Sequence, residues 1–313
     1  MATNIITSGA GAQGDLGLKV FMEVQEAFDR TNVFMDLITT KTIASGASAQ
    51  FIIGGLDGDI SKTQARVGGT TAVGSDIAVN DIQMDERVIV IDETVYDARR
   101  IDGREEKIAS YDVRGPVTGM IGEVLARKID TKICAQLGLA CEDTGLAGNP
   151  GAAAVVVNPT INGGASEGAT AQLKGDAMAE SIFEAEAALR TNEVTGDIYV
   201  AVSPVNYNYL VQSKNGVSAD YTSGNGGFDS GKIMMVGGVK VVKTTNLASA
   251  TNIAGIAGIA FTKDAVGMVN LVGLTSESNY DFNKFATLLS GRFAVGFGTL
   301  NPASCVAIAN VAQ

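Results

Sequence analysis

The sequence predicts an α+β fold that is organised around one long helix. An unbroken i+4 row of apolar residues predicts this helix over residues 116–139. Two strand patterns, at 47–53 and 86–92, flank a long segment that is rich in Gly, Asp, Ser and Thr. Strand patterns also dominate the chain after residue 257. With 313 residues, of which 46% are hydrophobic, the chain can form one large domain or two small ones.

The N-terminal part is predicted to be an arm that carries one amphipathic helix. Residues 1–14 are small and polar, and they include three glycines. Apolar residues between 18 and 28 then recur near helical spacing. Because only one side of this helix is apolar, it needs a partner surface to pack against.

Residues 46–92 are predicted to form an extended β-hairpin loop. The middle of this segment has few large apolar residues, so it cannot form a core of its own. Loops of this length without structure are uncommon and usually functional. We therefore expect the loop to lie on another surface, such as a neighbouring subunit.

Mixed charges and then the long helix occupy residues 93–142. Acids and bases are interspersed from 97 to 107, which suits either a solvated face or a polar contact between subunits. Pro116 fits the first turn of the helix, where its missing N–H costs nothing. At 1.5 Å per residue the helix would span roughly 36 Å and would act as a spine.

The second half of the chain is predicted to mix two helices with several strands. Ser203 and Pro204 are the cap and first residue of a short helix, and Gly237-Gly238 is typical of a two-residue hairpin turn. The remaining elements are expected at 176–189 (helix), 197–202, 233–236, 239–242, 257–262 and 266–271 (strands), and in a long polar-apolar run over 279–308.

The composition excludes several classes of enzyme. The chain has no His, which removes Ser-His-Asp and Cys-His catalysis and any zinc site that needs imidazole. With 34 acids against 23 bases, the net charge is -11. An acidic chain does not attract the DNA backbone in bulk, so if this protein meets DNA, we expect it to enclose the DNA and not to read its sequence.

Three cysteines, Cys134, Cys141 and Cys305, match no zinc pattern. We expect them to be small buried residues in a reducing cytoplasm. The N-terminus shows no basic region followed by an apolar run, and the longest apolar stretch, 253–261, is too short to span a bilayer. The sequence therefore predicts a cytoplasmic protein without a membrane partner.

Two segments match ligand-binding motifs only in part. Gly9, Gly11 and Gly14 form a literal G-x-G-x-x-G, but the alternating strands and helices of a dinucleotide fold do not follow it. The segment from Asp57 begins like a calcium loop, yet its sixth position is Lys62 instead of glycine. Adjacent acids such as those at 105–106 are expected to be solvent-exposed. We therefore predict no catalytic residue, no cofactor and no metal.

Several segments, in one order along nearly the whole chain, resemble the major capsid proteins of T-seven-like short-tailed bacteriophages (podoviruses). The similar residues are Ala27-Phe28-Asp29-Arg30-Thr31 in the arm, Ser45-Gly46-Ala47 and Glu86-Arg87-Val88-Ile89 beside the loop, Tyr111-Asp112-Val113-Arg114 before the long helix, Gly238-Val239-Lys240 in the late hairpin, and Arg292 and Pro302 near the end.

The resemblance implies the Hong Kong ninety-seven capsid fold, the fold of tailed-phage capsid proteins. Its parts would be an N-terminal arm with an amphipathic helix at 1–45, an extended loop (β-hairpin) at 46–92, a peripheral domain with the spine helix at 93–142, an axial domain at 143–264, and strands that return to the peripheral domain at 265–313.

The resemblance also implies a structural protein that assembles into hexamers and pentamers of an icosahedral head, with triangulation number seven. The implied partners are further copies of the chain, a scaffolding protein, a portal protein, optionally a decoration protein, and packaged double-stranded DNA without sequence readout. The proposed contacts between subunits are Phe21, Phe28, Leu56, Ile60, Val67, Arg99, Arg100, Arg104 and Glu105. The alternatives are a tail-tube or surface-layer subunit, and a nucleotide-dependent enzyme that uses the N-terminal glycines.

Overall fold

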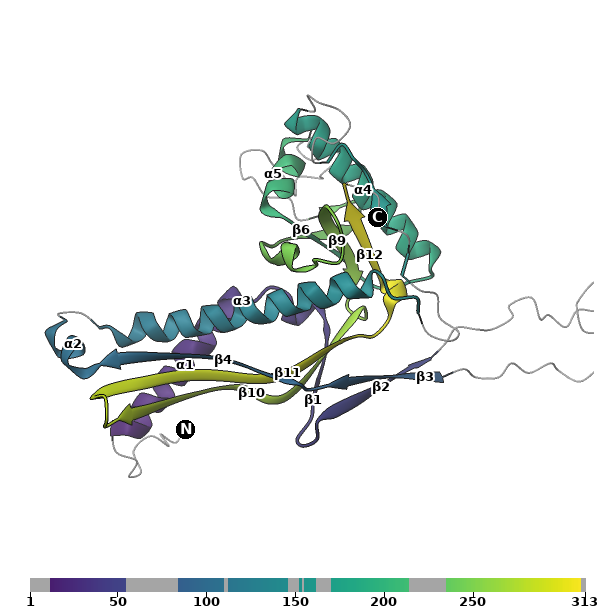
Figure 1. Ribbon diagram of the computed structural model, residues 1–313. Coiled ribbons are helices and arrows are strands. Elements are labelled where there is room, and N and C mark those ends of the chain that lie inside the picture. Colours follow the sequence, from purple (N-terminus) through teal and green to yellow (C-terminus); the bar gives the residue numbers. More distant parts are fainter. Residues whose placement is uncertain are drawn as a thin grey trace, which may run out of the picture.

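A computed structural model describes residues 12–54, 84–109, 112–145, 152–153, 155–161, 170–213 and 235–310. These residues form an elongated lobe, along which the long helix runs, and a second lobe that stands on one end of that helix (Figure 1). A two-stranded hairpin extends from the end of the elongated lobe nearest the second lobe (Figure 1). The mixture of helices and strands agrees with the predicted α+β class.

The elongated lobe is a twisted four-stranded sheet with two helices on one face. The strands follow the order β1-β10-β11-β4, in which only β1 and β10 are parallel. Gly291 of β11 lies close to Ile121 and Leu125 of α3 and to Val24 of α1, so both helices cover the same face. The elements are α1 (Ala12–Thr31), β1 (Thr39–Thr42), β4 (Glu93–Asp102), α2 (Gly103–Ile108), α3 (Arg114–Ala140), β10 (Val266–Asp281) and β11 (Ala286–Thr299), with the 3-10 turn η2 (Met35–Leu37) after α1.

The spine helix α3 is present where the apolar row predicted it, and it begins two residues earlier, at Arg114. Its 27 residues correspond to a length of about 40 Å at 1.5 Å per residue. The predicted row is the buried face, and its central members are Ile121, Leu125, Ile129, Ile133 and Leu137. This helix is therefore the common core element against which the rest of the elongated lobe packs.

The arm helix α1 packs on its own subunit, which corrects the expectation that Phe28 contacts a neighbouring subunit. Val20, Val24 and Phe28 are buried against α3 and the sheet. The approach of the two helices is very close at Gly122, where a Cβ atom would lie 2.4 Å from the Val24 carbonyl oxygen. The long helix supplies the apolar surface that the amphipathic pattern of α1 required, within one chain.

The predicted hairpin is confirmed. Strands β2 (Ser48–Gly54) and β3 (Met84–Val90) pair antiparallel, from Ser48 opposite Val90 to Gly54 opposite Met84. Residues 55–83, the rest of the predicted extended loop, lie outside the described residues.

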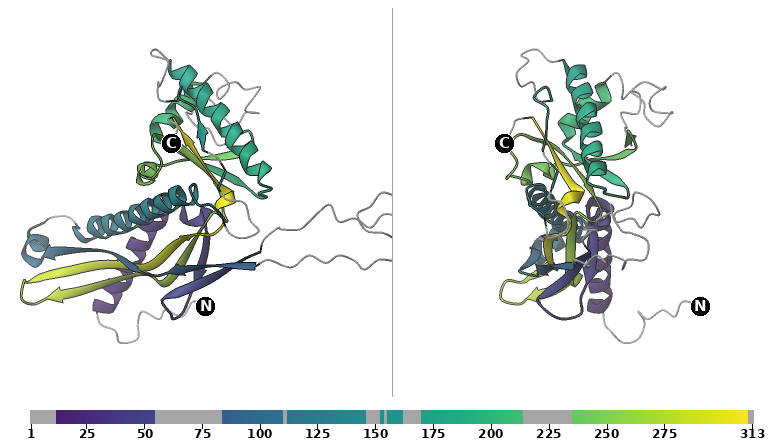
Figure 2. Two further views of the ribbon diagram at one scale, coloured as in Figure 1. Left: turned by 45° about the vertical axis from the view of Figure 1, so that its right-hand side comes forward. Right: turned by 90° about the vertical axis from the view of Figure 1, so that its right-hand side faces the viewer.

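The second lobe is a six-stranded sheet in the order β5-β12-β9-β6-β8-β7. Helices α4 and α5 cover one face, and the end of α3 packs on the other (Figures 1 and 2). The elements are β5 (Val156–Val157), α4 (Ala171–Thr191), β6 (Ile198–Val202), α5 (Pro204–Gln212), β7 (Met235–Val236), β8 (Val239–Lys243), β9 (Ile256–Thr262) and β12 (Cys305–Ala309), with the 3-10 turns η3 (Asn246–Ser249) and η4 (Pro302–Ser304).

Two local predictions in this lobe are confirmed by their geometry. The Ser203 side chain accepts a hydrogen bond from the Asn206 N–H at 3.3 Å and caps α5, with Pro204 as its first residue. Gly237 and Gly238 join β7 to β8 with φ values of +58° and +86°. Both positive φ angles are those that a primed hairpin turn requires.

The C-terminal segment divides between the two lobes, which corrects its placement as one unit over 265–313. Strands β10 and β11 belong to the four-stranded sheet, but β12 pairs with β9 and β5 in the six-stranded sheet. The turn η4 after β11 redirects the chain. Both faces of β12 are apolar, so the strand is stable only in a layer that is covered on both sides. The expected run over 279–308 is correspondingly broken at 282–285 and at 300–304.

Candidate functional site

The three thiols lie in the core, and the pKa values of two of them are raised. Cys134, Cys141 and Cys305 are all buried and free of disulfides. Burial, with a smaller contribution from Asp130, raises the pKa of Cys134 to about 12. Burial also raises the pKa of Cys141, whose sulfur lies 2.8 Å from that of Cys305. Since the nucleophile would be the thiolate, both Cys134 and Cys141 are held in their inert form.

Within the described ranges, no cluster of three His, Cys, Asp or Glu side chains is arranged to hold a metal ion. The described helices also include none that is both long and apolar enough to cross a membrane.

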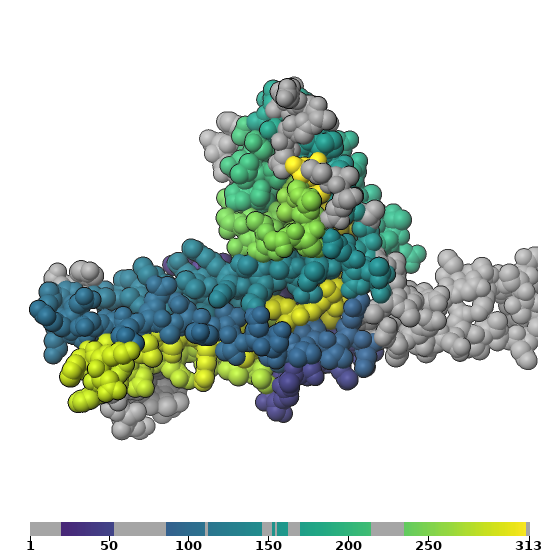
Figure 3. Space-filling model, in the orientation of Figure 1, coloured from purple at the N-terminus to yellow at the C-terminus, as the bar shows by residue number. Residues whose placement is uncertain are grey.

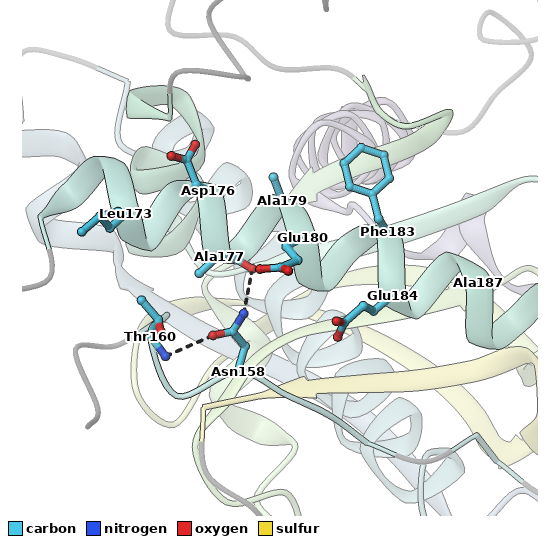
Figure 4. A pocket seen from close by; sticks show the side chains of 10 residues that line it. All are labelled: Asn158, Thr160, Leu173, Asp176, Ala177, Ala179, Glu180, Phe183, Glu184 and Ala187. Atoms are coloured by element: carbon cyan, nitrogen blue, oxygen red, sulfur yellow. Dashed lines mark hydrogen bonds between the residues drawn. The ribbon is translucent and has the colours of Figure 1, made fainter. Parts of the chain in front are cut away.

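A groove of about 750 Å³ runs along the exposed side of α4 (Figure 4). Three carboxylates, Asp176, Glu180 and Glu184, follow one another at intervals of one helical turn. Asn158 faces them, but its amide nitrogen donates to the Ala177 carbonyl at 3.4 Å. The Asn158 side-chain oxygen in turn accepts from a backbone N–H of the same turn. Among the described residues, the groove lining includes no Lys or Arg, so no basic side chain there pairs with the three carboxylates.

The far tip of the elongated lobe concentrates charged groups of both signs. The Asp102 carboxylate caps α2, where it accepts from the Arg104 N–H at 2.7 Å. Arg114 at the start of α3 donates to the Glu106 carboxylate at 3.0 Å. These groups and Lys284 line a depression of about 870 Å³ between α2 and the β10–β11 turn.

The same tip exposes large apolar side chains to solvent. Phe282 and Phe285 are 75% and 64% exposed, and their ring centroids lie 5.8 Å apart. Phe285 has a φ of +48°, and its carbonyl accepts a hydrogen bond from the Gly103 N–H at 3.1 Å, which ties the turn to α2. Ile108 and Tyr280 are exposed beside them. In Figure 3 this tip is the left-hand end of the molecule, where α2 and the β10–β11 turn meet.

The β2–β3 hairpin has a second exposed apolar face. Ile52, Val88 and Val90 are 75%, 49% and 55% exposed, and the strand register puts them on one side of the ribbon. Ala49 and Ile89 point to the other side and are buried against the four-stranded sheet. The hairpin is therefore anchored by one face and offers the other.

Three of the six predicted contact residues that the structure describes are exposed. Arg104 and Glu105 lie on α2 at the tip, and Arg100 is exposed on the adjoining strand β4. Arg99 is half-buried and pairs with Asp97 at 3.1 Å. The structure thus brings the charged part of the predicted set to one end of the lobe.

The other predicted contact residues fare differently. Phe21 is half-buried on α1, while Phe28 is 3% exposed and its ring lies 5.9 Å from that of Phe293. Phe28 is therefore a core residue of its own subunit, and its assignment to a contact between subunits is wrong. Leu56, Ile60 and Val67 lie outside the described residues.

Sequence reasoning missed the apolar residues of the tip. Phe282 and Phe285 flank Asn283-Lys284 in a short polar segment between two strand patterns. Aromatic side chains in such a turn have no neighbouring strand to cover them. The two phenylalanines on either side of a short polar turn are therefore the sequence signal that indicates an exposed apolar site. The exposed face of the hairpin could not be predicted in this way. The alternation of side chains along a strand does not tell which of its two faces packs on the subunit.

Comparisons with known proteins agree on one kind of relative. The model of the Gp10A-like family, described as major capsid protein, matches residues 62–309. The major capsid protein of Escherichia phage T7 is 28% identical over 338 aligned positions, which cover 96% of this chain and 94% of that protein. The chain covers 94% of the phage T7 protein and is thus similar to nearly the whole of it.

Solved structures show the same likeness in three dimensions. The capsid of the cyanophage P-SCSP1u contains a chain with a TM-score of 0.72 and 28% identity, covering 89% of this chain and 88% of that one. A chain of the mature capsid of bacteriophage PhiM1 has a TM-score of 0.66 at 16% identity, covering 89% of this chain and 86% of that one. The fold is therefore that of phage capsid proteins.

Proposed function

The chain belongs to the Gp10A-like family of major capsid proteins, and from this premise we propose that copies of it assemble into the hexamers and pentamers of an icosahedral phage head. It has the fold of tailed-phage capsid proteins, and its function is structural. The observation in the subunit that supports the proposal most directly is the exposed apolar surface at the tip and on the hairpin.

The tip is the first proposed contact surface between subunits. Two neighbouring aromatic rings, Phe282 and Phe285, and Ile108 provide apolar area, and each aromatic side chain can bury roughly 150–250 Å². Around them lie Arg104, Glu105 and Arg100, which can pair with charges of the opposite sign on another copy. An apolar centre with a charged rim is the usual composition of an interface.

The hairpin and the loop that it carries are the second proposed contact surface. The exposed face of Ile52, Val88 and Val90 would be covered by a neighbouring subunit. Leu56, Ile60 and Val67 continue the chain beyond this face and are proposed to extend the same contact. Movement of the hairpin, the arm and the spine helix between two packings would accompany expansion of the shell.

The proposed partners follow from this role. They are further copies of the chain, a scaffolding protein during assembly in the bacterial cytoplasm, a portal protein at one vertex, and optionally a decoration protein. Packaged double-stranded DNA would be enclosed without sequence readout in a shell of triangulation number seven. The net charge of -11 supports the role of a container, because like charge limits adhesion of DNA to the wall.

Electron microscopy tests the proposal. The full chain, expressed with and without a candidate scaffolding protein, should give closed polyhedral particles. Deletion of residues 56–82 should abolish these particles and leave a soluble subunit with unchanged helix content by circular dichroism, because the deleted loop adds contacts to neighbours and no core. Normal particles from the deletion would contradict the role of the loop, and tubes or flat lattices from the full chain would contradict the head.

A further inference from the structure

Asp130 is a buried carboxylate at the place where the arm helix α1 ends. It lies in the middle of the spine helix α3 and is only 2% exposed. Carboxylates are almost never buried to this degree unless they are paired, because removing a charge from water is costly. The contacts of Asp130 therefore require an explanation.

Among the described residues, the hydrogen bonds to Asp130 all come from the turn that follows α1. Its Oδ1 accepts from the Asn32 side-chain amide at 3.1 Å and from the Phe34 N–H at 3.3 Å. Its Oδ2 accepts from the Val33 N–H at 3.2 Å. Asn32 is itself held, because its side-chain oxygen accepts from the Met35 N–H at 2.9 Å. One carboxylate thus fixes the direction in which the chain leaves the arm helix.

None of these donors is charged. Two arginines of these helices pair elsewhere, because Arg30 and Arg127 both contact Glu123. On the other side of α3, Lys132 pairs with Glu93 of β4. Cys134, one turn along α3, is protonated and neutral. In the part of the chain that the structure describes, no cation bonds to Asp130.

The missing counter-ion sets the protonation behaviour of Asp130. Burial raises the pKa of Asp130 from 3.8 to about 6, while the hydrogen bonds from the Phe34 and Val33 N–H groups act in the opposite direction. Hydrogen bonds from neutral donors therefore only partly offset the loss of hydration. Proton uptake can occur on Oδ2 and still leave Oδ1 to accept from Asn32 and Phe34.

We propose that Asp130 is a proton-linked latch, which holds the end of the arm helix and the following turn on the spine helix and grips more tightly when it is protonated. Gly122 provides only a close approach, and the hydroxyl of Thr118 donates to the Glu23 carboxylate at 2.6 Å. The latch is a property of the single subunit and does not depend on assembly.

The sign of the effect follows from the direction of the pKa change. When the arm is released, Asp130 regains water and its ordinary pKa, so the docked state binds the proton more tightly. The extra stability of docking is fully present below pH 3.8 and is lost as the pH rises through about 6. Between pH 7 and pH 5 the docking equilibrium should shift toward the docked arm by about tenfold.

Hydrogen exchange of the full-length subunit, followed by mass spectrometry at several pH values and corrected for intrinsic rates, tests the latch. Protection of the amides of residues 20–34 should rise about tenfold from pH 7 to pH 5. The variant Asp130→Asn keeps an acceptor oxygen and cannot titrate, so its protection should not change with pH. The control is Glu123→Gln, an exposed carboxylate on the same helix that also contacts the arm. It should keep the pH dependence of the unmodified chain.

The same pH dependence in Asp130→Asn and in the unmodified chain would overturn the proposal, as would protection that falls on acidification. A second variant covers the case in which Asp130→Asn does not fold. Asn32→Ala removes one donor from the arm side and leaves α3 unchanged. Because that donor stabilises the ionised form, its loss should move the midpoint of the pH dependence upward. An unmoved midpoint would also overturn the latch.

Discussion

Strand β12 of the six-stranded lobe and the two ends of the elongated lobe differ in how far their apolar side chains are buried. Every residue of β12 is buried, with Val306 and Ile308 toward α4 and Ala307 and Ala309 toward α3. At the tip and on the hairpin, by contrast, side chains as large as Phe282 remain mostly exposed. Strand β12 is thus covered on both faces within the chain, whereas the tip and the hairpin leave apolar surface exposed.

This difference separates what folds the subunit from what joins subunits. A strand that is covered on both faces contributes to stability in the monomer, at about 25 cal/mol per Å² of apolar area buried. A hairpin that is covered on one face stabilises the subunit through the side chains of that face only. The side chains of its other face remain available for contact with a partner. Substitutions in the two kinds of region should therefore affect different measurements.

The largest expected effect on subunit stability is that of Ile308→Ala. The side chain is fully buried, so its truncation should cost roughly 2–5 kcal/mol in free energy of unfolding. The matched change in the hairpin is Ile52→Ala, which removes a side chain that is 75% exposed and should stay within about 0.5 kcal/mol. Urea unfolding measures the loss of stability in both variants. Equal losses would contradict the difference between the two regions.

A smaller effect is expected at the contact between arm and spine. Gly122→Ala places a methyl group against the Val24 carbonyl, so α1 must move away, at a cost of roughly 1–3 kcal/mol. Gly119→Ala, one turn earlier in the same helix, meets no atom within 4 Å. That change should stabilise by up to about 1 kcal/mol through helix propensity alone. Thermal unfolding should show a lower melting temperature for Gly122→Ala and a higher one for Gly119→Ala. A change in the same direction for both variants would contradict the close approach of the two helices.

The smallest effect on the subunit is expected at the tip. The double variant Phe282→Ser and Phe285→Ser removes two exposed rings, so the free energy of unfolding should change by less than about 0.5 kcal/mol. Particle formation should nevertheless fail, because the apolar centre of the proposed contact is gone. The control Leu173→Ser changes an exposed apolar residue on α4 and should leave particles intact. Normal particles from the double variant would remove the tip from the proposed contacts.

Local features of the fold could be predicted well from the sequence. The i+4 row of α3, the capping pair Ser203 and Pro204, and the Gly237-Gly238 turn each encode their structure within a few residues. The hairpin strands were also predicted, because alternation and flanking glycines are local signals. The charged part of the candidate site was found for the same reason, as a run of mixed charge in one segment.

The fold class, the spine helix and the hairpin follow from residue patterns along the chain, and the lack of His excludes histidine chemistry. Packing between distant segments places α1 on its own spine helix, brings β12 into the six-stranded sheet, and makes Phe28 a core residue. The same packing buries Asp130, to which no cation bonds among the described residues. The periodicity of apolar residues predicts that one face of a helix or strand is buried. The surface that buries this face belongs to residues far away in the chain. Which distant surface that is depends on packing, and packing is a property of the whole molecule.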